Sequence, residues 1–353
     1  MITTFVFDGA LREPGNSVIE SIPQFRSLAE IGEVSTVHTE TGDLFESALL
    51  GYHPFEVQAS PGVLAVAGMG FDPPEKSTHY CLSLMSFSEG LIAPASHLLQ
   101  PNEATEIKSI LTQLNTKLLT IVSHNNQFAL VWEKLGQQLL TPPAESMSYQ
   151  TSLPQGDGEI ELRRLIDDSI NILTDLDFNK RRQDEGKPLL NCLWPWGAGV
   201  RIPCPNLNFR FGTPRKVFTY SLRLQGMARL AGYSQKVAFP TTLSNLFFEK
   251  EVLSLGGLFL QSYRPSLKEE ELEESLAKAG ENWLNGIFDA LRNKKPFQLI
   301  ALDRQRTTGI VMRHTATEIQ SKFPFDERTL TESKARSLSL NQICRASSPQ
   351  DLE

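Results

Sequence analysis

The sequence predicts an α/β protein in which a mostly parallel sheet is sandwiched by helices and a small α+β domain is inserted. Strand-length apolar segments alternate with amphipathic segments of helical spacing, which is typical of βαβ units. A length of 353 residues suffices for a large core with a smaller inserted domain. A hydrophobic content of 40% excludes global disorder.

The first part of the chain begins the predicted sheet. An apolar strand over residues 3–7 leads through Asp8-Gly9 into a helix over residues 18–31, where apolar side chains recur at helical spacing. A second αβ unit covers residues 44–51, and residues 81–87 alternate as a strand does.

The inserted domain is predicted over residues 94–150. It contains a helix over 103–118 and two strands over 119–123 and 127–133, joined by the turn His124-Asn125-Asn126. Pro142-Pro143 and Gly156-Asp157-Gly158 have the composition of a linker that returns to the core. The core is then expected over residues 1–93 and 151–328, with a polar, flexible tail over 329–353.

Helices are predicted over residues 160–176 and 266–293. The sheet is expected to continue with strands that cover residues 189–194, 216–220, 258–263, 297–302 and 309–313.

The most informative stretch runs from Leu173 to Gly199. Its apolar run LLNCLWPW reads as a strand that ends in a Gly-Ala-Gly turn. Ligands collect beyond the carboxyl ends of strands in open α/β sheets, so the stretch is a candidate site. Because two tryptophans are costly to expose, plain core packing is the alternative interpretation.

This stretch resembles the N-x-x-R…N-x-(I/L)-W-P-W-G-x-G signature of the archaeal-type, cofactor-independent phosphoglycerate mutases, members of the alkaline-phosphatase superfamily. Further similar segments are Phe7-Asp8-Gly9, Leu49 to Pro54, Leu153 to Gly156, Phe211-Gly212 and Gly226 to Tyr233. The resemblance implies an alkaline-phosphatase-like core, with the inserted domain as the cap.

The family's nucleophile is a serine, and the resemblance places Gly42 at that position. Glycine has no side chain that could attack phosphorus. Asp43 is kept, Glu46 replaces an asparagine, and the adjacent Thr41 could serve only after a shift in register.

The family's metal site is also incomplete. Asp8 stands at its Asp-Gly position, as a vestigial metal ligand or as an aspartate that caps the following turn. None of the six histidines lies in an Asp-x-x-x-His or Asp-His arrangement, although two-metal phosphoryl transfer needs several Asp and His ligands. We therefore expect no cofactor, with a divalent metal only if the chain is an enzyme.

The composition limits which binding partners and which cellular location we expect. The net charge of −7 and the pI near 5.5 argue against nucleic acid. No apolar run approaches the ~18 residues of a membrane span. The four cysteines, Cys81, Cys192, Cys204 and Cys344, show no metal-site or disulfide spacing, which favours the cytoplasm.

The C-terminal part, from the helix over 266–293 onward, resembles RpfE-type regulatory proteins. That similarity implies a bacterial, regulatory protein.

Three functions remain open. The favoured one is a non-catalytic, pseudoenzyme-like relative of phosphoglycerate mutase that binds a small phosphate- or carboxylate-bearing ligand or a protein partner. Its pocket would comprise Asp8, Asp43, Asn179, Arg182, Asn191, Trp194, Gly197 and Gly199. Arg182 is the expected anion contact, because a guanidinium binds such groups bidentately. The alternatives are an active mutase or phosphatase with relocated residues, and a protein-interaction module built on the helix over 267–293.

Overall fold

The computed structural model describes residues 3–11, 33–38, 45–53, 56–144, 146–207, 209, 216–236, 257–262, 274, 297–303, 308–314 and 337–339. The chain divides into two compact units, which are described separately. Residues 1–58 and 204–353 form the first, here called the parallel unit. Residues 59–203 form the second, here called the antiparallel unit.

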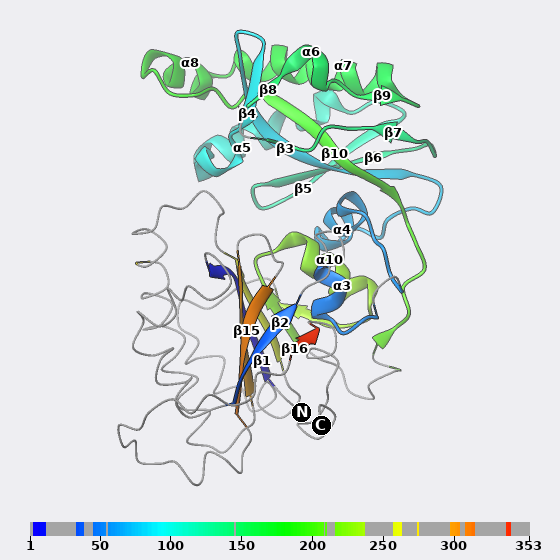
Figure 1. Ribbon diagram of the computed structural model, residues 1–353. Helices are drawn as coiled ribbons and strands as arrows, with labels where there is room; N and C mark the ends of the chain where they lie inside the picture. The colour runs from blue at the N-terminus through cyan, green and yellow to red at the C-terminus, as the bar shows by residue number, and fades with distance from the viewer. Residues whose placement is uncertain are drawn as a thin grey trace. The chain divides into compact units, whose positions relative to one another are not determined.

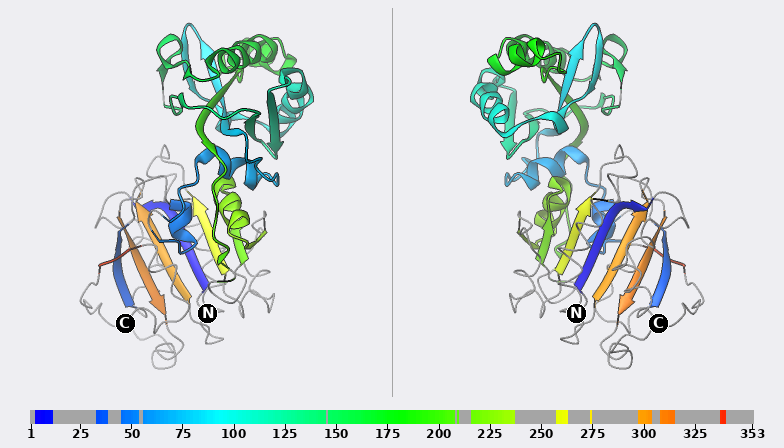
Figure 2. Two further views of the ribbon diagram at one scale, coloured as in Figure 1. Left: turned by 90° about the vertical axis from the view of Figure 1, so that its right-hand side faces the viewer. Right: turned by 90° about the vertical axis from the view of Figure 1, so that its left-hand side faces the viewer.

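The parallel unit is built on an eight-stranded sheet (Figure 2). In spatial order its strands are β12 (Ser234–Lys236), β11 (Lys216–Thr219), β13 (Gly257–Ser262), β1 (Thr3–Leu11), β14 (Phe297–Asp303), β15 (Thr308–His314), β2 (Glu33–His38) and β16 (Ser337–Ser339). Only the pairings of β15 with β14 and with β2 are antiparallel. The sheet is therefore mostly parallel, as the sequence predicts.

The central strands of this sheet are apolar along their length. Phe5, Val6 and Phe7 of β1 are fully buried, as are Leu299 to Leu302 of β14. Such continuous burial is typical of parallel strands covered on both faces. The described helices of this unit are α3 (Phe45–Leu49) and α10 (Leu222–Leu230), which contact each other.

The antiparallel unit has its own six-stranded sheet (Figure 1). Its strands are β5 (Leu119–His124), β6 (Gln127–Trp132), β3 (Thr78–Ser88), β4 (Leu91–Pro94), β8 (Met147–Ser148) and β10 (Cys192–Val200). A two-stranded ribbon of β7 (Gln138–Leu139) and β9 (Gln155–Gly156) accompanies it. The long strand β3 pairs with β6 on one side and with β10 on the other.

Helices cover both faces of this sheet. In Figure 1, α7 (Glu159–Thr174) lies on one face and α4 (Pro61–Gly68) on the other, where α4 contacts β3, β6 and β10. The remaining helical segments are α5 (Pro101–Ile110), α6 (Tyr149–Ser152), α8 (Asp177–Asp184), η2 (Ser96–Leu98) and η3 (Leu111–Leu114). In α7, Leu162, Leu165, Ile166 and Leu173 are buried at helical spacing, so one stripe of the helix packs on the sheet.

Most sequence-predicted elements that fall on described residues are present. They include β1, β3, β5, β6, α7, β11, β13, β14 and β15. The predicted helix over 103–118 is shorter, because the α-helix ends at Ile110 and a 3₁₀ turn follows. The predicted helices over 18–31 and 266–293 lie outside the described residues, as does the tail over 329–353 apart from β16.

The prediction for residues 189–194 was wrong in two respects. The strand β10 continues through the Gly-Ala-Gly segment to Val200 instead of ending in a turn there. It also belongs to the antiparallel sheet, paired with β3, and not to the parallel sheet. Pro195 fits this position because, among the described strands, β10 pairs with β3 alone, and an edge strand tolerates a residue without an N–H group.

This pairing also changes the domain boundaries. Because β3 and β10 form one sheet with β5 and β6, all of these strands belong to one unit, over residues 59–203. The expected limits at 94 and 150 would divide that sheet, and the expected core segments 1–93 and 151–328 would each include part of it. No helix in the described part of the chain is long and apolar enough to cross a membrane.

Candidate functional site

Two acidic residues stand toward the carboxyl ends of neighbouring parallel strands in the parallel unit. Asp8 belongs to β1, and Asp303 is the last residue of the adjacent strand β14. Both are buried, with exposed fractions of 4% and 3%. The backbone of Asp8 is in register with Ser262 of β13 on its other side. This edge is where ligands collect in open α/β sheets.

Asp303 was missed by the sequence analysis. Its signal is an aspartate that ends the apolar strand FQLIALD, whereas Asp8 was identified through the resemblance to the family's Asp-Gly position. What the sequence lacked was the strand order, which brings β14 beside β1 although almost 300 residues separate them.

The described acidic residues at this edge are fewer than a two-metal centre needs. The described residues include no group of three or more His, Cys, Asp or Glu side chains placed to hold a metal ion. Two-metal catalysis needs several such ligands around ions about 4 Å apart. The metal role of Asp8 stays a prediction, and Asp43, Gly42 and Thr41 lie outside the described residues.

An ion pair links the two described helices of the parallel unit. Nε of Arg223, in the first turn of α10, lies 3.0 Å from Oε1 of Glu46 in the first turn of α3. The side chain of Glu46 is 3% exposed and that of Arg223 is 27% exposed. A buried carboxylate therefore holds one end of a guanidinium that reaches solvent.

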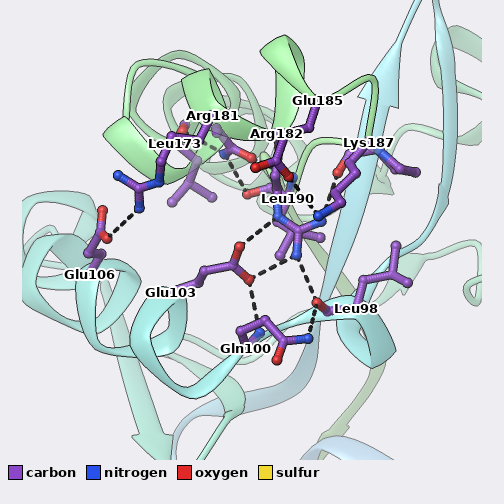
Figure 3. Close-up of polar contacts among 12 residues, drawn as sticks. Leu98, Gln100, Glu103, Glu106, Leu173, Arg181, Arg182, Glu185, Lys187 and Leu190 are labelled. Carbon is purple, nitrogen blue, oxygen red and sulfur yellow. Dashed lines mark hydrogen bonds and ion pairs between the residues drawn. The ribbon is translucent and has the colours of Figure 1, made fainter.

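In the antiparallel unit, Arg182 is already engaged (Figure 3). Its Nε and Nη2 atoms each lie 2.8 Å from one carboxylate oxygen of Glu103, which is a bidentate pair. Nη2 also donates to the carbonyl oxygen of Leu98 at 2.8 Å, and Nη1 to that of Pro188 at 3.1 Å. An external anion would have to displace Glu103. The ligand role of Arg182 thus stays a prediction. In the structure, the carboxylate of Glu103 occupies the place that the anion would take.

The two asparagines of the signature bond to backbone groups. Asn179 donates to the carbonyl oxygens of Leu173 and Leu190 and accepts from the Leu190 N–H at 2.9 Å. Asn191 accepts from the Phe87 N–H at 2.8 Å and donates to the Phe87 carbonyl and to Thr174. Both side chains therefore tie separate backbone segments to one another.

The two tryptophans differ in burial. Trp194 is 1% exposed, packs among Met85, Ile166 and neighbouring apolar residues, and donates to the Thr141 carbonyl at 2.8 Å. Trp196 is partly exposed and donates to Ser83 Oγ at 2.9 Å. For Trp194 the core-packing alternative describes the contacts well.

The two glycines allow close packing against the start of α4. Gly197 has φ of 65°, and a Cβ atom there would lie 2.8 Å from Cβ of Pro61. A Cβ atom on Gly199 would lie 2.0 Å from Oγ of Ser60, the N-cap of α4. Larger residues at either position would push α4 from the sheet.

A buried histidine lies beside Gly199. Nδ1 of His79 is 3.2 Å from the Gly199 carbonyl oxygen, so this nitrogen carries the proton when the ring is neutral. The residue is 0% exposed, and its Nε2 atom has no partner among the described residues. Burial lowers the pKa of His79 from its ordinary value of 6.5, although the Gly199 hydrogen bond and Glu133 oppose that shift.

We therefore expect the antiparallel unit to lose stability on acidification. Because the folded-state pKa of His79 lies below the unfolded-state value, the unfolded chain binds the proton first as the pH falls. The stability that neutral His79 contributes is present above pH 6.5 and declines below it. Urea midpoints measured from pH 8 to pH 5 should show this decline in the wild type and a smaller one in His79→Gln. The exposed His97 provides the control, and equal slopes in wild type, His79→Gln and His97→Gln would contradict the prediction.

The predicted pocket residues are thus distributed over both units. Asp8 lies in the parallel unit. The other described members lie in the antiparallel unit and are Asn179, Arg182, Asn191, Trp194, Gly197 and Gly199. Within that unit they bond to backbone, to Glu103 or to α4, and their shared ligand role stays a prediction.

The chain is similar in sequence to known phosphoglycerate mutases. The chain is 25% identical over 226 residues to 2,3-bisphosphoglycerate-independent phosphoglycerate mutase 2 of Methanothermobacter thermautotrophicus, covering 60% of this chain and 55% of that protein. It is 23% identical over 205 residues to phosphoglycerate mutase 1 of Methanocaldococcus jannaschii, covering 54% and 50%. This chain is a relative of the archaeal cofactor-independent phosphoglycerate mutases. No family model matches it.

Solved structures of related fold cover nearly the whole chain. The cofactor-independent phosphoglycerate mutase of Thermoplasma acidophilum superposes with a TM-score of 0.56 at 14% identity, over 98% of both chains. A Pyrococcus horikoshii protein superposes with a TM-score of 0.64 at 15% identity, over 97% of this chain and 95% of that one. The fold is thus alkaline-phosphatase-like. In sequence, the chain spans about half the length of the curated relatives it matches.

Proposed function

We propose that this chain is a non-catalytic relative of the phosphoglycerate mutases and acts in a regulatory role by binding a small phosphate- or carboxylate-bearing ligand. The observation that carries the proposal is the donor set at the carboxyl edge of the parallel sheet. Asp8 and Asp303 stand there, and the described residues add no third ligand to form a metal group. A two-metal phosphoryl transfer has too few donors in this set.

The sequence supports the same conclusion independently. Gly42 occupies the position at which the resemblance places the family's nucleophile, and it has no group that could carry a phosphoryl intermediate. The residue after Asp303 is Arg304, so no histidine accompanies the second aspartate. Loss of the nucleophile and loss of metal ligands are separate changes, and an active enzyme would have to replace both.

Two further parts of the proposal rest on sequence. The regulatory role and a bacterial source come from the resemblance to RpfE-type proteins, and the helix over 267–293 that could bind a protein partner lies outside the described residues. A cytoplasmic location is supported by the described cysteines Cys81, Cys192 and Cys204, which are thiols and not disulfides.

An active mutase or phosphatase is the alternative that one observation favours. Asp8 and Asp303 are buried carboxylates on adjacent parallel strands, and such a pair could hold part of a metal centre completed by other residues. Elemental analysis of the purified protein separates the two functions, since two tightly bound divalent ions per chain would favour the enzyme.

We expect the purified chain to show no phosphoglycerate mutase turnover with Mn²⁺ or Mg²⁺ supplied. The reason is the missing nucleophile together with the incomplete donor set. The assay follows interconversion of 3- and 2-phosphoglycerate, with an archaeal mutase in the same buffer as the positive control. Turnover that disappears in Asp8→Ala would contradict the proposal, since only a working metal site would depend on that carboxylate.

A further inference from the structure

We propose that Arg223, and not Arg182, is the residue through which this protein binds a small oxyanion, a phosphate or carboxylate group. The inference rests on the proposed function, because it names the anion contact of the ligand site at the carboxyl edge of the parallel sheet. The two arginines have different surroundings.

Arg223 has N–H donors that make no hydrogen bond to the described residues. A guanidinium carries five N–H groups, and the ion pair of Arg223 is with a single carboxylate, that of Glu46, where Nε lies 3.0 Å from Oε1. With 27% of its side chain exposed, the terminal fork is open to a ligand. A planar fork of this kind matches the two oxygens of a phosphate or carboxylate.

Arg182 of the same chain is an arginine whose guanidinium is hydrogen-bonded within the protein. Its side chain is 8% exposed and donates to both oxygens of Glu103 and to two carbonyl oxygens. Its fork is therefore occupied by a carboxylate of the protein itself. The guanidinium of Arg182 is thus hydrogen-bonded to groups of the protein itself, whereas that of Arg223 pairs with Glu46 alone among the described residues.

The start of α10 favours an anion near Arg223. Arg223 is the second residue of α10, after the N-cap Ser221, where the helix dipole disfavours a cation and favours an anion. The carboxylate of Glu46 compensates the charge of Arg223, so the cation is tolerated at this helix start.

The location agrees with ligand binding in this fold class. The helix α10 begins directly after β11, so Arg223 lies at the carboxyl end of a parallel strand. Only β13 separates β11 from β1, which carries Asp8. Strands in a sheet are about 4.8 Å apart, so β11 and β1 lie about 10 Å apart. An anion on Arg223 would thus bind at the same edge as Asp8 without direct contact between the two.

Glu46 is a positioning residue in this arrangement. Its buried carboxylate pairs with Arg223 and limits the positions that the guanidinium can take. Replacing Glu46 by glutamine keeps the shape and a hydrogen-bond acceptor for Nε. Anion binding should then persist, although less rigidly oriented.

Phosphate titration of the full chain tests the assignment. Inorganic phosphate and 3-phosphoglycerate are titrated in separate calorimetric experiments, with the wild type expected to bind at least one of them. Arg223→Gln and Arg223→Lys should bind about ten- to a hundredfold more weakly, the equivalent of a lost charged hydrogen bond. Arg229→Gln, at the other end of α10, is the matched control and should bind as the wild type does. Circular dichroism of each variant confirms that it is folded.

Several outcomes would overturn the assignment. Binding that survives both Arg223 variants, or that is lost in a folded Arg182→Lys variant and kept in Arg223→Lys, would place the anion elsewhere. Absence of wild-type binding for both compounds at millimolar concentration would remove the site altogether. Failure of the proposed function would be recognised by a different result. Turnover of 3-phosphoglycerate would contradict a non-catalytic role, but the Arg223 variants would still show where the anion binds.

Discussion

Replacement of Arg182 by alanine is expected to destabilise the antiparallel unit by about 3–5 kcal/mol. The change leaves Glu103 buried without its bidentate partner and removes the hydrogen bonds to the carbonyl oxygens of Leu98 and Pro188 (Figure 3). Burial by itself would raise the pKa of Glu103, but the hydrogen bonds from Arg182 and the Gln100 N–H hold it below its ordinary value. Urea denaturation followed by circular dichroism measures the loss.

Two controls distinguish the buried pair from surface charge. Arg181 pairs with Glu106 at 3.3 Å, but its side chain is 57% exposed, so Arg181→Ala should cost at most about 1 kcal/mol. The double variant Arg182→Met with Glu103→Leu removes both charges and should recover most of the stability lost in Arg182→Ala. An Arg182→Ala variant as stable as Arg181→Ala would show that the buried pair contributes little.

The parallel sheet could be predicted because its strands carry a local signal. Segments such as TTFVFD and FQLIALD are largely apolar, which is typical of a strand buried on both faces, and each carries an aspartate after its apolar run. The membership of β10 could not be predicted in this way. Its apolar run fits a central parallel strand and an antiparallel edge strand equally well, and only pairing with β3 over more than 100 residues of sequence separation decides between them.

Several residues of the candidate site could be predicted from the sequence, but their partners across the fold could not. The resemblance identified Asn179, Arg182 and Asn191 through the N-x-x-R…N signature, and each is indeed buried. It could not show that the partner of Arg182 is Glu103, since that contact joins α8 to α5 across 79 positions. Arg223 gave no signal, because an arginine in the first turn of a helix acquires meaning only when its neighbour Glu46 and its open fork are known.

Replacement of Trp194 by alanine is the second large effect that we expect, again about 3–5 kcal/mol. The indole is 1% exposed and fills a cluster with Met85, Ile166 and Cys192, so its removal leaves a cavity between β10, β3 and α7. It also removes the Nε1 hydrogen bond to the Thr141 carbonyl, which joins the loop before β8 to the sheet. The free energy of unfolding is measured in urea, followed by circular dichroism at 222 nm.

Two matched variants separate the volume of Trp194 from its hydrogen bond. Trp194→Phe keeps most of the apolar contact and should lose only about 1–2 kcal/mol, the cost of leaving the Thr141 carbonyl oxygen without its donor. Trp196→Ala, two residues further along β10, removes a partly exposed indole and should cost less than Trp194→Ala, because less apolar surface returns to water. If Trp196→Ala proved the more damaging of the two alanine variants, the packing of β10 between β3 and α7 would have to be reassigned.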